Sequence, residues 1–326
     1  MRVITSPDQF NLSDLYVDLS WLTGNRMFLK CEGLNFAGSI KLKAAVEMID
    51  FAERSGVLRP GSTIVESSSG NLGVALSMVA AGRGYSFICI TDSRCTLGAR
   101  QLMRTLGADV RLITEPHPVD GLVGARVRYV KRLCAENDGY FWPNQYVNAN
   151  NWGSHYRLTG PEILSSFPDL EVLFVGAGTT GTLMGCARYV REHRPSVRVV
   201  AIDTVGSVTF GGPAAPRMIP GLGSAAPSQQ LDESFIDDVV MVPEAEAVRM
   251  CWSLSRRGFL FGGSTGTVLA GATAWYADRP GIEVGTAVAI SPDLGDRYLD
   301  TVYQPQWVTD LYGSEVMQGI REAELS

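Results

Sequence analysis

The sequence predicts an α/β protein whose parallel sheets are wrapped by helices, and three observations carry that prediction. Short apolar runs typical of buried strands alternate along most of the chain with segments of helical periodicity, which favours parallel, doubly wound sheets. Turns rich in glycine, serine and threonine stand at three junctions that lead into helices, at 67–73, 176–182 and 261–267. The segment 141–152 is rich in amides and aromatic rings but poor in periodicity, and it predicts a crossing between two lobes.

Composition places the chain among ordinary globular proteins. It has 326 residues, 45% hydrophobic and 19% charged, and a net charge of −6 without a basic tract, which argues against nucleic-acid binding. The start of the chain does not resemble a signal peptide, and no apolar run approaches membrane-spanning length. Six cysteines without a CxxC pair, and three histidines, predict neither a zinc site nor a disulfide framework. We therefore expect a cytoplasmic protein that binds no metal, membrane or nucleic acid.

The first half of the chain predicts alternating strands and helices, after a weakly patterned start that is expected to cover another element. An alternating run over 26–32 indicates a strand. A loop then ends at Ser39, which is placed to cap a helix over about 40–54. The other expected elements are strands over 62–66, 86–91 and 109–114, and helices ending at 81 and covering 97–106 and 120–136.

A second alternating run follows the crossing segment. Its expected elements are strands over 172–175, 197–203, 238–242 and 286–290, and helices over 153–166, from 183, over 243–257 and ending at 276. The Gly- and Pro-rich stretch 206–227, which contains Arg217, lacks apolar periodicity. A loop of this length is often functional.

The turn 176–182, GAGTTGT, is the stretch around which the chain is organised. A glycine- and threonine-rich turn before a helix gathers unpaired N–H groups and hydroxyls at the positive end of the helix dipole, which suits a phosphate. The serine-rich loop 67–73 suits a carboxylate for the same reason. Tight turns and plain helix caps use similar residues, so each motif has a purely structural alternative. Lys41 would lie in the first turn of its helix, where the dipole favours a neutral amine, although a solvated surface lysine is the alternative.

Together these stretches resemble the fold type II family of pyridoxal-phosphate enzymes, in the branch of cysteine synthase and cystathionine β-synthase. The resemblance covers about 26–303. GSIK resembles the family's segment with the Schiff-base lysine, SSSGN its substrate-carboxylate loop, GTTGT its phosphate-binding turn, and GGSTG the stretch whose serine faces the pyridine nitrogen. The resemblance implies a two-lobed, tryptophan synthase β-like fold with pyridoxal 5'-phosphate in the cleft. It also implies a smaller substrate-binding lobe over 39–144 and a larger cofactor-binding lobe over 1–38 and 145–326.

The resemblance also assigns residues. It places the cofactor and the catalytic amine on Lys41, with Lys43 as a second candidate because the family's S-x-K-D-R reads SIKLK here. The implied cofactor-binding residues are Lys41, Asn71, Gly178, Thr179, Thr180, Gly181, Thr182 and Ser264. The expected substrate-binding residues are Ser67, Ser68, Ser69, Asn71, Gln145, Tyr146, Trp152, His155 and Arg217. Tyr146, Trp152 and His155 are expected near the cleft from their place in or next to the crossing segment, and packing residues are the alternative for them. Arg217 is the first choice to hold a departing phosphate, and Arg297 the second.

A narrower resemblance concerns the substrates. Leu72 stands where cysteine synthases usually have threonine, and the phosphate-binding turn carries an additional threonine. ESSSGNLG, NQYVNANNWGSHY, PGLG and PDLGDRYLD resemble the branch that makes N-(2-amino-2-carboxyethyl)-L-glutamate from O-phospho-L-serine and L-glutamate. This implies a β-replacement through an aminoacrylate, toward L-2,3-diaminopropionate for siderophores or peptide antibiotics. The family implies a homodimer.

Three other functions remain open at this point. A cysteine synthase would use O-acetyl- or O-phosphoserine with sulfide, and it needs no pocket for a second carboxylate substrate. The Asn-, Gln-, Trp- and His-rich crossing segment favours glutamate instead. A serine or threonine dehydratase is less favoured, because nothing marks a regulatory tail. A non-catalytic binding protein of the family would lose the lysine or the phosphate-binding turn, and this chain has both.

Overall fold

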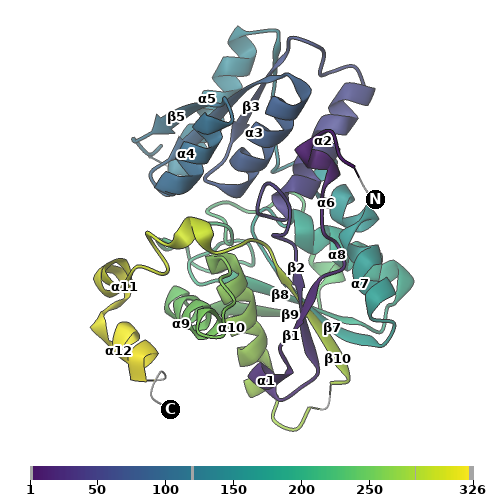
Figure 1. The fold of residues 1–326 in the computed structure, drawn as a ribbon, viewed down its shortest axis with the longest axis vertical. Helices are drawn as coiled ribbons and strands as arrows, with labels where there is room; N and C mark the ends of the chain where they lie inside the picture. The colour runs from purple at the N-terminus through teal and green to yellow at the C-terminus, as the bar shows by residue number, and fades with distance from the viewer. Residues whose placement is uncertain (1–2, 119–120, 283, 323–326) are drawn as a thin grey trace.

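Two sheets organise the structure, a computed structural model that describes residues 3–118, 121–282 and 284–322 (Figure 1). The smaller sheet is parallel and has the order β5-β4-β3-β6. The larger has the order β1-β2-β10-β7-β8-β9 and is parallel except for the antiparallel pair β1 and β2. The strands are β1 (Tyr16–Asp18), β2 (Met27–Cys31), β3 (Thr63–Ser67), β4 (Ser86–Asp92), β5 (Asp109–Ile113), β6 (Tyr140–Phe141), β7 (Leu170–Gly176), β8 (Arg198–Thr204), β9 (Asp238–Val242) and β10 (Thr286–Ser291).

Helices cover both faces of the smaller sheet. Side chains alternate between the faces of a strand, so neighbouring residues of β3 enter different cores. Ile64 packs with α2 (Lys41–Arg54), α3 (Asn71–Arg83) and α4 (Leu97–Thr105), whereas Val65 packs with α5 (Gly121–Glu136) on the other face. Both side chains are fully buried, which holds the sheet rigidly between its helices.

The larger sheet is covered in the same way. Phe174 of β7 packs against α9 (Glu244–Ser255) and α10 (Gly263–Ala277). Its neighbour Leu173 packs on the opposite face with α7 (Thr159–Ser166) and α8 (Gly181–His193). The helix α6 (Ala149–Arg157) lies against α8 and also contacts α2, so it joins the two halves of the molecule.

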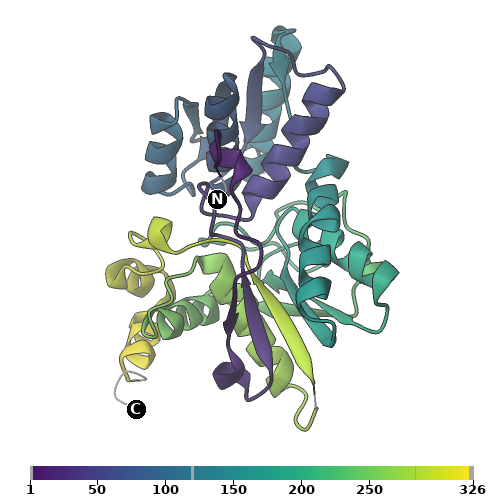
Figure 2. The ribbon, with the colours of Figure 1, turned by 45° about the vertical axis from the view of Figure 1, so that its right-hand side comes forward.

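Short elements complete the chain. The C-terminal helices α11 and α12 pack on α9, at the lower left in Figure 2. The elements are η1 (Pro7–Gln9), α1 (Ser20–Thr23), η2 (Glu233–Phe235), η3 (Asp296–Tyr298), α11 (Pro305–Tyr312) and α12 (Ser314–Glu322). Within the described ranges, none of the helices has both the length and the apolar character needed to cross a membrane.

The predicted α/β class is confirmed, and so are most core strands and helices. The expected helix over 153–166 is in fact two helices, α6 and α7, and α6 already begins at Ala149 inside the segment expected to be irregular. Asn148 explains that start, because its side chain accepts a hydrogen bond from Asn150 N at 2.9 Å and caps the helix. The expected cap at Ser39 is wrong: Ile40 is the N-cap of α2, and Ser39 Oγ is buried without a hydrogen-bond partner.

Some elements were not anticipated, and one boundary cannot be compared. The edge strand β1, the two-residue β6 and the helices α11 and α12 gave no clear pattern in the sequence. Asp120, the expected first residue of the helix now seen as α5, lies outside the described residues.

Candidate active site

A cavity of about 440 Å³ lies where the carboxyl ends of strands from both sheets converge. Its wall includes segments that follow β3, β4, β7 and β10. In open α/β sheets, ligands bind beyond the carboxyl ends of the strands, where loops and helix N-termini present free N–H groups. The turn 176–182 and the serine-rich loop thus meet in one space, although about a hundred residues of chain separate them.

The turn between β7 and α8 forms part of the cavity wall as a closely packed backbone. Gly178, Thr179, Thr180, Gly181 and Thr182 all line the cavity. A Cβ on Gly178 would lie 2.4 Å from the Gly221 carbonyl oxygen, and one on Gly181 would lie 2.3 Å from Asn151 Oδ1. Glycine is therefore required at both positions. The result is a helix N-terminus whose N–H groups a phosphate can approach.

Thr180 takes a backbone conformation that favours glycine. Its φ is 65°, in the left-handed region, where a β-branched residue is strained. Its hydroxyl donates to the Thr179 carbonyl oxygen at 2.7 Å and contacts Ser228 Oγ at 2.8 Å. The contact with Ser228 ties the turn to the residue that directly follows the long loop 206–227. The two bonds offset part of the cost of the strained conformation.

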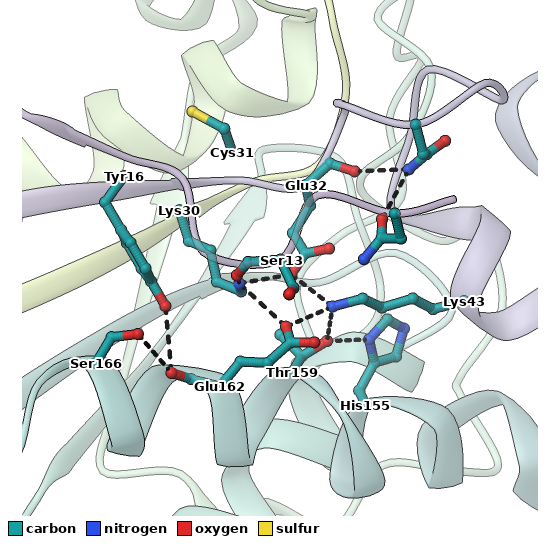
Figure 3. A network of polar contacts seen from close by, with 12 residues as sticks. Ser13, Tyr16, Lys30, Cys31, Glu32, Lys43, His155, Thr159, Glu162 and Ser166 are labelled. Atoms are coloured by element: carbon teal, nitrogen blue, oxygen red, sulfur yellow. Dashed lines mark hydrogen bonds and ion pairs between the residues drawn. The ribbon is translucent and has the colours of Figure 1, made fainter. Parts of the chain in front are cut away.

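Lys41 and Lys43 occupy different environments. Lys41 lines the cavity. Lys43 Nζ instead lies in a buried cluster, 2.9 Å from Glu32 Oε1, 2.7 Å from Glu162 Oε2 and 3.2 Å from Thr159 Oγ1 (Figure 3). The placement favours Lys41 as the amine available to a ligand in the cavity.

Burial shifts the protonation of the cavity lysine and of a neighbouring carboxyl. It lowers the pKa of Lys41 to about 8, against the opposing charge of Glu66. It raises the pKa of Glu66 to about 7, although Trp142 Nε1 and the N–H groups of Ser67 and Gln145 donate to that carboxyl. At neutral pH a part of Lys41 is therefore an unprotonated amine. Sequence reasoning missed Glu66; its position directly before the serine-rich loop was the available signal.

The serine-rich loop reaches the cavity through only some of its residues. Ser68, Ser69 and Asn71 line it, whereas Ser67 is fully buried outside the lining. Ser68 Oγ accepts from the N–H groups of Gly70 and Gly73, at 3.2 and 2.9 Å, and so stabilises the start of α3. Ser67 contributes its carbonyl oxygen to Gln145 Nε2, at 2.9 Å. Its expected direct role is thus replaced by a supporting one.

Asn71 joins the two halves of the cavity wall. Its Nδ2 donates to Asp293 Oδ2 at 2.8 Å, and its Oδ1 accepts from Arg297 Nη1 at 2.9 Å. Arg297 also donates to the Ala37 carbonyl oxygen at 2.5 Å, so its guanidinium is held by structural contacts. Burial raises the pKa of Asp293, to which Tyr298 also donates a hydrogen bond.

The crossing segment divides between the cavity and other surroundings. Gln145 and Tyr146 line the cavity. Trp152 does not; it lines an open pocket on another face, with the Arg188 guanidinium carbon 5.1 Å from its ring centroid. His155 is fully buried, and its ring nitrogens lie 3.0 Å from Thr159 Oγ1 and 3.2 Å from Thr182 Oγ1. Trp152 and His155 therefore lie outside the cavity lining, because successive turns of α6 face different neighbours.

The cavity lining is cationic. No carboxylate side chain is among the described residues that form it. Its six basic residues are Lys41, Arg94, Arg126, Lys131, Arg217 and Arg297. Burial lowers the pKa of Arg217, and its Nε has no hydrogen-bond partner among the described residues. Ser264, at the start of α10, also lines the cavity.

Arg94 and Arg126 were not predicted from the sequence. Arg94 follows the carboxyl end of β4, next to the serine-rich loop, and that position was a usable signal. Arg126 lies inside α5 and only its packing turns it inward; 2% of it is exposed, and its Nη1 has no partner in the described chain. Asp92 lies behind both, 3.0 Å from Arg94 Nη2 and 3.2 Å from Arg126 Nε. Burial alone would raise the pKa of Asp92, but the two arginines outweigh it and lower that pKa.

Comparison with known proteins identifies the family. A family profile described as "Pyridoxal-phosphate dependent enzyme" matches residues 16–293. The chain is 36% identical over 304 residues to a protein named N-(2-amino-2-carboxyethyl)-L-glutamate synthase from Ralstonia nicotianae, covering 92% of this chain and 89% of that relative.

Solved structures agree in architecture. A lysine-to-alanine variant of O-ureido-L-serine synthase, bound to O-ureido-L-serine, superposes with a TM-score of 0.85 at 31% identity and covers 95% of both chains. A hydrogen sulfide-producing enzyme from Fusobacterium nucleatum superposes with a TM-score of 0.82 at 28% identity, covering 91% of this chain and 100% of that one. The cavity has the parts that the cofactor needs: an amine, a glycine-rich helix N-terminus and a buried hydroxyl. The chain belongs to the pyridoxal-phosphate-dependent enzymes, with the fold type II architecture.

Proposed function

We propose that this transferase catalyses a β-replacement in which the amine of L-glutamate displaces the phosphate of O-phospho-L-serine, giving N-(2-amino-2-carboxyethyl)-L-glutamate. The cationic lining is the observation that carries the proposal. The two substrates bring one phosphate and three carboxylates, and six basic side chains with no acidic one face them. Such a lining favours anionic substrates through charge complementarity. The similarity to the Ralstonia protein supports the same reaction.

The cofactor would be held by the residues already placed at the cavity. Lys41 would carry it, the turn 178–182 would bind its phosphate, Asn71 would contact its ring hydroxyl, and Ser264 would face its ring nitrogen. Bound pyridoxal phosphate withdraws electrons from the α-carbon of an amino acid and so permits loss of a β-substituent. A neutral partner such as Ser264 leaves the ring nitrogen unprotonated, which favours β-elimination over transamination.

The remaining residues would orient the amino-acid donor. Ser68, Ser69, Asn71 and Gln145 offer hydroxyl and amide groups to the carboxylate of phosphoserine. Lys41, whose pKa is lowered to about 8, would take the α-proton once its amine is free. The Ser67 carbonyl oxygen holds Gln145 in place, so Ser67 would act indirectly.

Three arginines would bind the departing phosphate and the carboxylates of glutamate. Arg217, with its unpartnered Nε, would receive the departing phosphate. Arg94 and Arg126 would bind the carboxylates of glutamate, with Tyr146 beside them in the cavity wall. Of these contacts, the one between Arg126 and a carboxylate would stabilise the complex most. A buried guanidinium nitrogen without a partner costs free energy, and a bound anion removes that cost.

A sulfide-using β-replacement is the second candidate, and the similarity to the hydrogen sulfide-producing enzyme favours it. The glutamate-using and sulfide-using reactions are distinguished by supplying the holoenzyme with O-phospho-L-serine and either L-glutamate or sulfide. The products are identified by mass spectrometry. We expect phosphate release and the glutamate adduct. In Arg126→Gln, we expect KM for glutamate to rise roughly 10- to 100-fold, because the variant loses one charge-assisted contact with the substrate. Cysteine from sulfide, with no glutamate adduct, would overturn the proposal.

A variant of Arg217 tests whether the amino-acid donor is O-phospho-L-serine. Arg217→Met should reduce kcat/KM for O-phospho-L-serine roughly 10- to 100-fold more than for O-acetyl-L-serine, because only the first leaves as a multiply charged anion. Equal losses with the two donors would show that Arg217 does not meet the leaving phosphate.

We also propose a cytoplasmic homodimer that supplies L-2,3-diaminopropionate to siderophore or peptide-antibiotic synthesis. The family resemblance supports the dimer, which light scattering of the purified protein would test. We retain the lobes 39–144 and 1–38 with 145–326, a division supported by the smaller sheet, whose strands all fall between Thr63 and Phe141.

A further inference from the structure

Lys30, Glu32, Lys43 and Glu162 form a ring of four charges (Figure 3), and none of the four lines the cavity. The first three are buried, and the Glu162 side chain is 22% exposed. Lys30 Nζ is 3.3 Å from Glu32 Oε1 and 3.1 Å from Glu162 Oε2, and Lys43 Nζ is 2.9 and 2.7 Å from the same two oxygens. Each lysine thus contacts both glutamates. The ring holds Lys43 in one orientation, with one N–H group left for Thr159 Oγ1, at 3.2 Å.

The direction of the hydrogen bonds beyond the ring follows from the chemistry of the groups. An ammonium only donates, so the Thr159 hydroxyl accepts from Lys43. The hydrogen of that hydroxyl is then available to its other partner, His155 Nδ1, at 3.0 Å. A neutral imidazole carries one hydrogen. If Nδ1 accepts, the hydrogen is on Nε2, which donates to Thr182 Oγ1 at 3.2 Å.

His155 is neutral in these surroundings. It is fully buried, and burial together with the nearby charges of Lys43 and Lys41 lowers its pKa well below the ordinary value. Thr182 ends the chain of contacts. Its hydroxyl accepts from His155 and lies in the cavity wall, in the turn before α8. The hydroxyl hydrogen is therefore left for a group inside the cavity.

We propose that this relay, from the ring of charges through Thr159 and His155 to Thr182, holds the Thr182 hydroxyl as a donor to the phosphate of the cofactor. His155 is then a positioning residue: it contacts no substrate, and its tautomer decides which way the hydroxyl points. The relay explains why a buried histidine separates a salt-bridge cluster from a phosphate-binding turn. The inference rests on the proposed position of the phosphate at 178–182.

The tautomer is the first test, and it needs no variant of the relay. In the holoenzyme labelled with ¹⁵N-histidine, only three histidines contribute signals. His117→Gln and His193→Gln, outside the relay, identify the signals of His155. We expect an unprotonated Nδ1 and a protonated Nε2 from pH 6 to pH 8. A hydrogen on Nδ1, or an imidazolium in that range, would overturn the relay.

Variants of Thr159 provide the second test, through binding of pyridoxal phosphate to the apoprotein. Thr159→Val removes the hydroxyl at nearly constant shape, and Thr159→Ser restores it. We expect Thr159→Val to weaken binding of the cofactor about 3- to 10-fold, because the Thr182 hydroxyl stays but loses its orientation. Thr182→Val should weaken it roughly 10- to 100-fold, the loss of a hydrogen bond to a charged group. The ³¹P resonance of the bound phosphate should shift in both, and Thr159→Ser should restore it.

Pyridoxal, which lacks the phosphate, is the matched ligand control. Its affinity should be unchanged by Thr159→Val. Equal weakening of pyridoxal and pyridoxal phosphate would show a general structural effect and overturn the inference. These readouts involve neither phosphoserine nor glutamate, so failure of the proposed reaction is distinguishable from failure of the relay.

Discussion

Lys41 and Lys43 lie two residues apart on α2 and serve opposite sides of that helix. Lys41 lines the cavity, and Lys43 Nζ is bound to Glu32, Thr159 and Glu162 in the ring of charges. Two residues along an α-helix correspond to a rotation of about 200° around its axis. Lysines at this spacing therefore point to opposite sides of the helix and contact different neighbours. The same helix therefore supplies the cavity with an amine and anchors the polar cluster behind it.

Substitutions of the two lysines should have different effects, on activity for Lys41 and on stability for Lys43. Lys41→Ala should remove the cofactor's absorption band and lower activity roughly 1,000-fold or more while the fold persists, because it removes the proposed nucleophile and base. Lys43→Met should cost about 1–3 kcal/mol in the free energy of unfolding, because it leaves Lys30 alone to balance the charges of Glu32 and Glu162. Absorption spectra and urea unfolding measure the two effects. Arg54→Met, an exposed change on the same helix, should cost no more than about 1 kcal/mol. An Lys43→Met variant as stable as the parent would contradict the burial of the ring.

Attachment of the cofactor should depend on pH through Lys41. Only the unprotonated amine attacks the aldehyde of pyridoxal phosphate, and the pKa of Lys41 is lowered to about 8. The rate of attachment to the apoprotein should therefore rise about tenfold per pH unit below pH 8 and level off above it. Stopped-flow absorbance measures it. A rate that still rises steeply toward pH 10 would mean that the amine keeps its ordinary pKa.

Thr180 should separate backbone strain from hydrogen bonding. Thr180→Val keeps the β-branched shape at φ 65° but loses the bonds to Thr179 and Ser228. It should cost about 1–3 kcal/mol in the free energy of unfolding. In Thr180→Gly, relief of the strain offsets the same loss, so we expect a change within about 1 kcal/mol. Urea unfolding of both variants tests this, and equal destabilisation would show that the conformation is not strained.

Gly181 should be intolerant of a methyl group. Its Cβ would lie 2.3 Å from Asn151 Oδ1, so Gly181→Ala must displace Asn151 or the turn. We expect weaker binding of pyridoxal phosphate, measured by fluorescence titration. Gly98→Ala is the control, because Gly98 is exposed in the first turn of α4 and nothing lies within 4 Å of its Cβ position. It should leave binding unchanged and stability equal or slightly higher. Unchanged binding in both variants would contradict the close approach of backbone at this turn.

Local signals were sufficient for much of the fold. Apolar runs flanked by turn residues identified core strands such as β4 and β7, because burial on both faces demands continuous apolar sequence. The edge strand β1 is three residues long and half-exposed, so it left no such pattern. The irregular segment 141–152 was misjudged from Ala149 onward, because its amides suggested a loop while Asn148 used one amide as a helix cap.

The sequence by itself determined the α/β class, the family and the stretches that meet at the cavity, because turns and helix N-termini depend on residues close together in the chain. Only the tertiary structure decided which side chains face that cavity. Arg126 enters it from the middle of α5, whereas Trp152 and His155 turn away from it on α6. A helix presents every side of itself to some neighbour, and which side meets the ligand is set by packing between elements far apart in sequence.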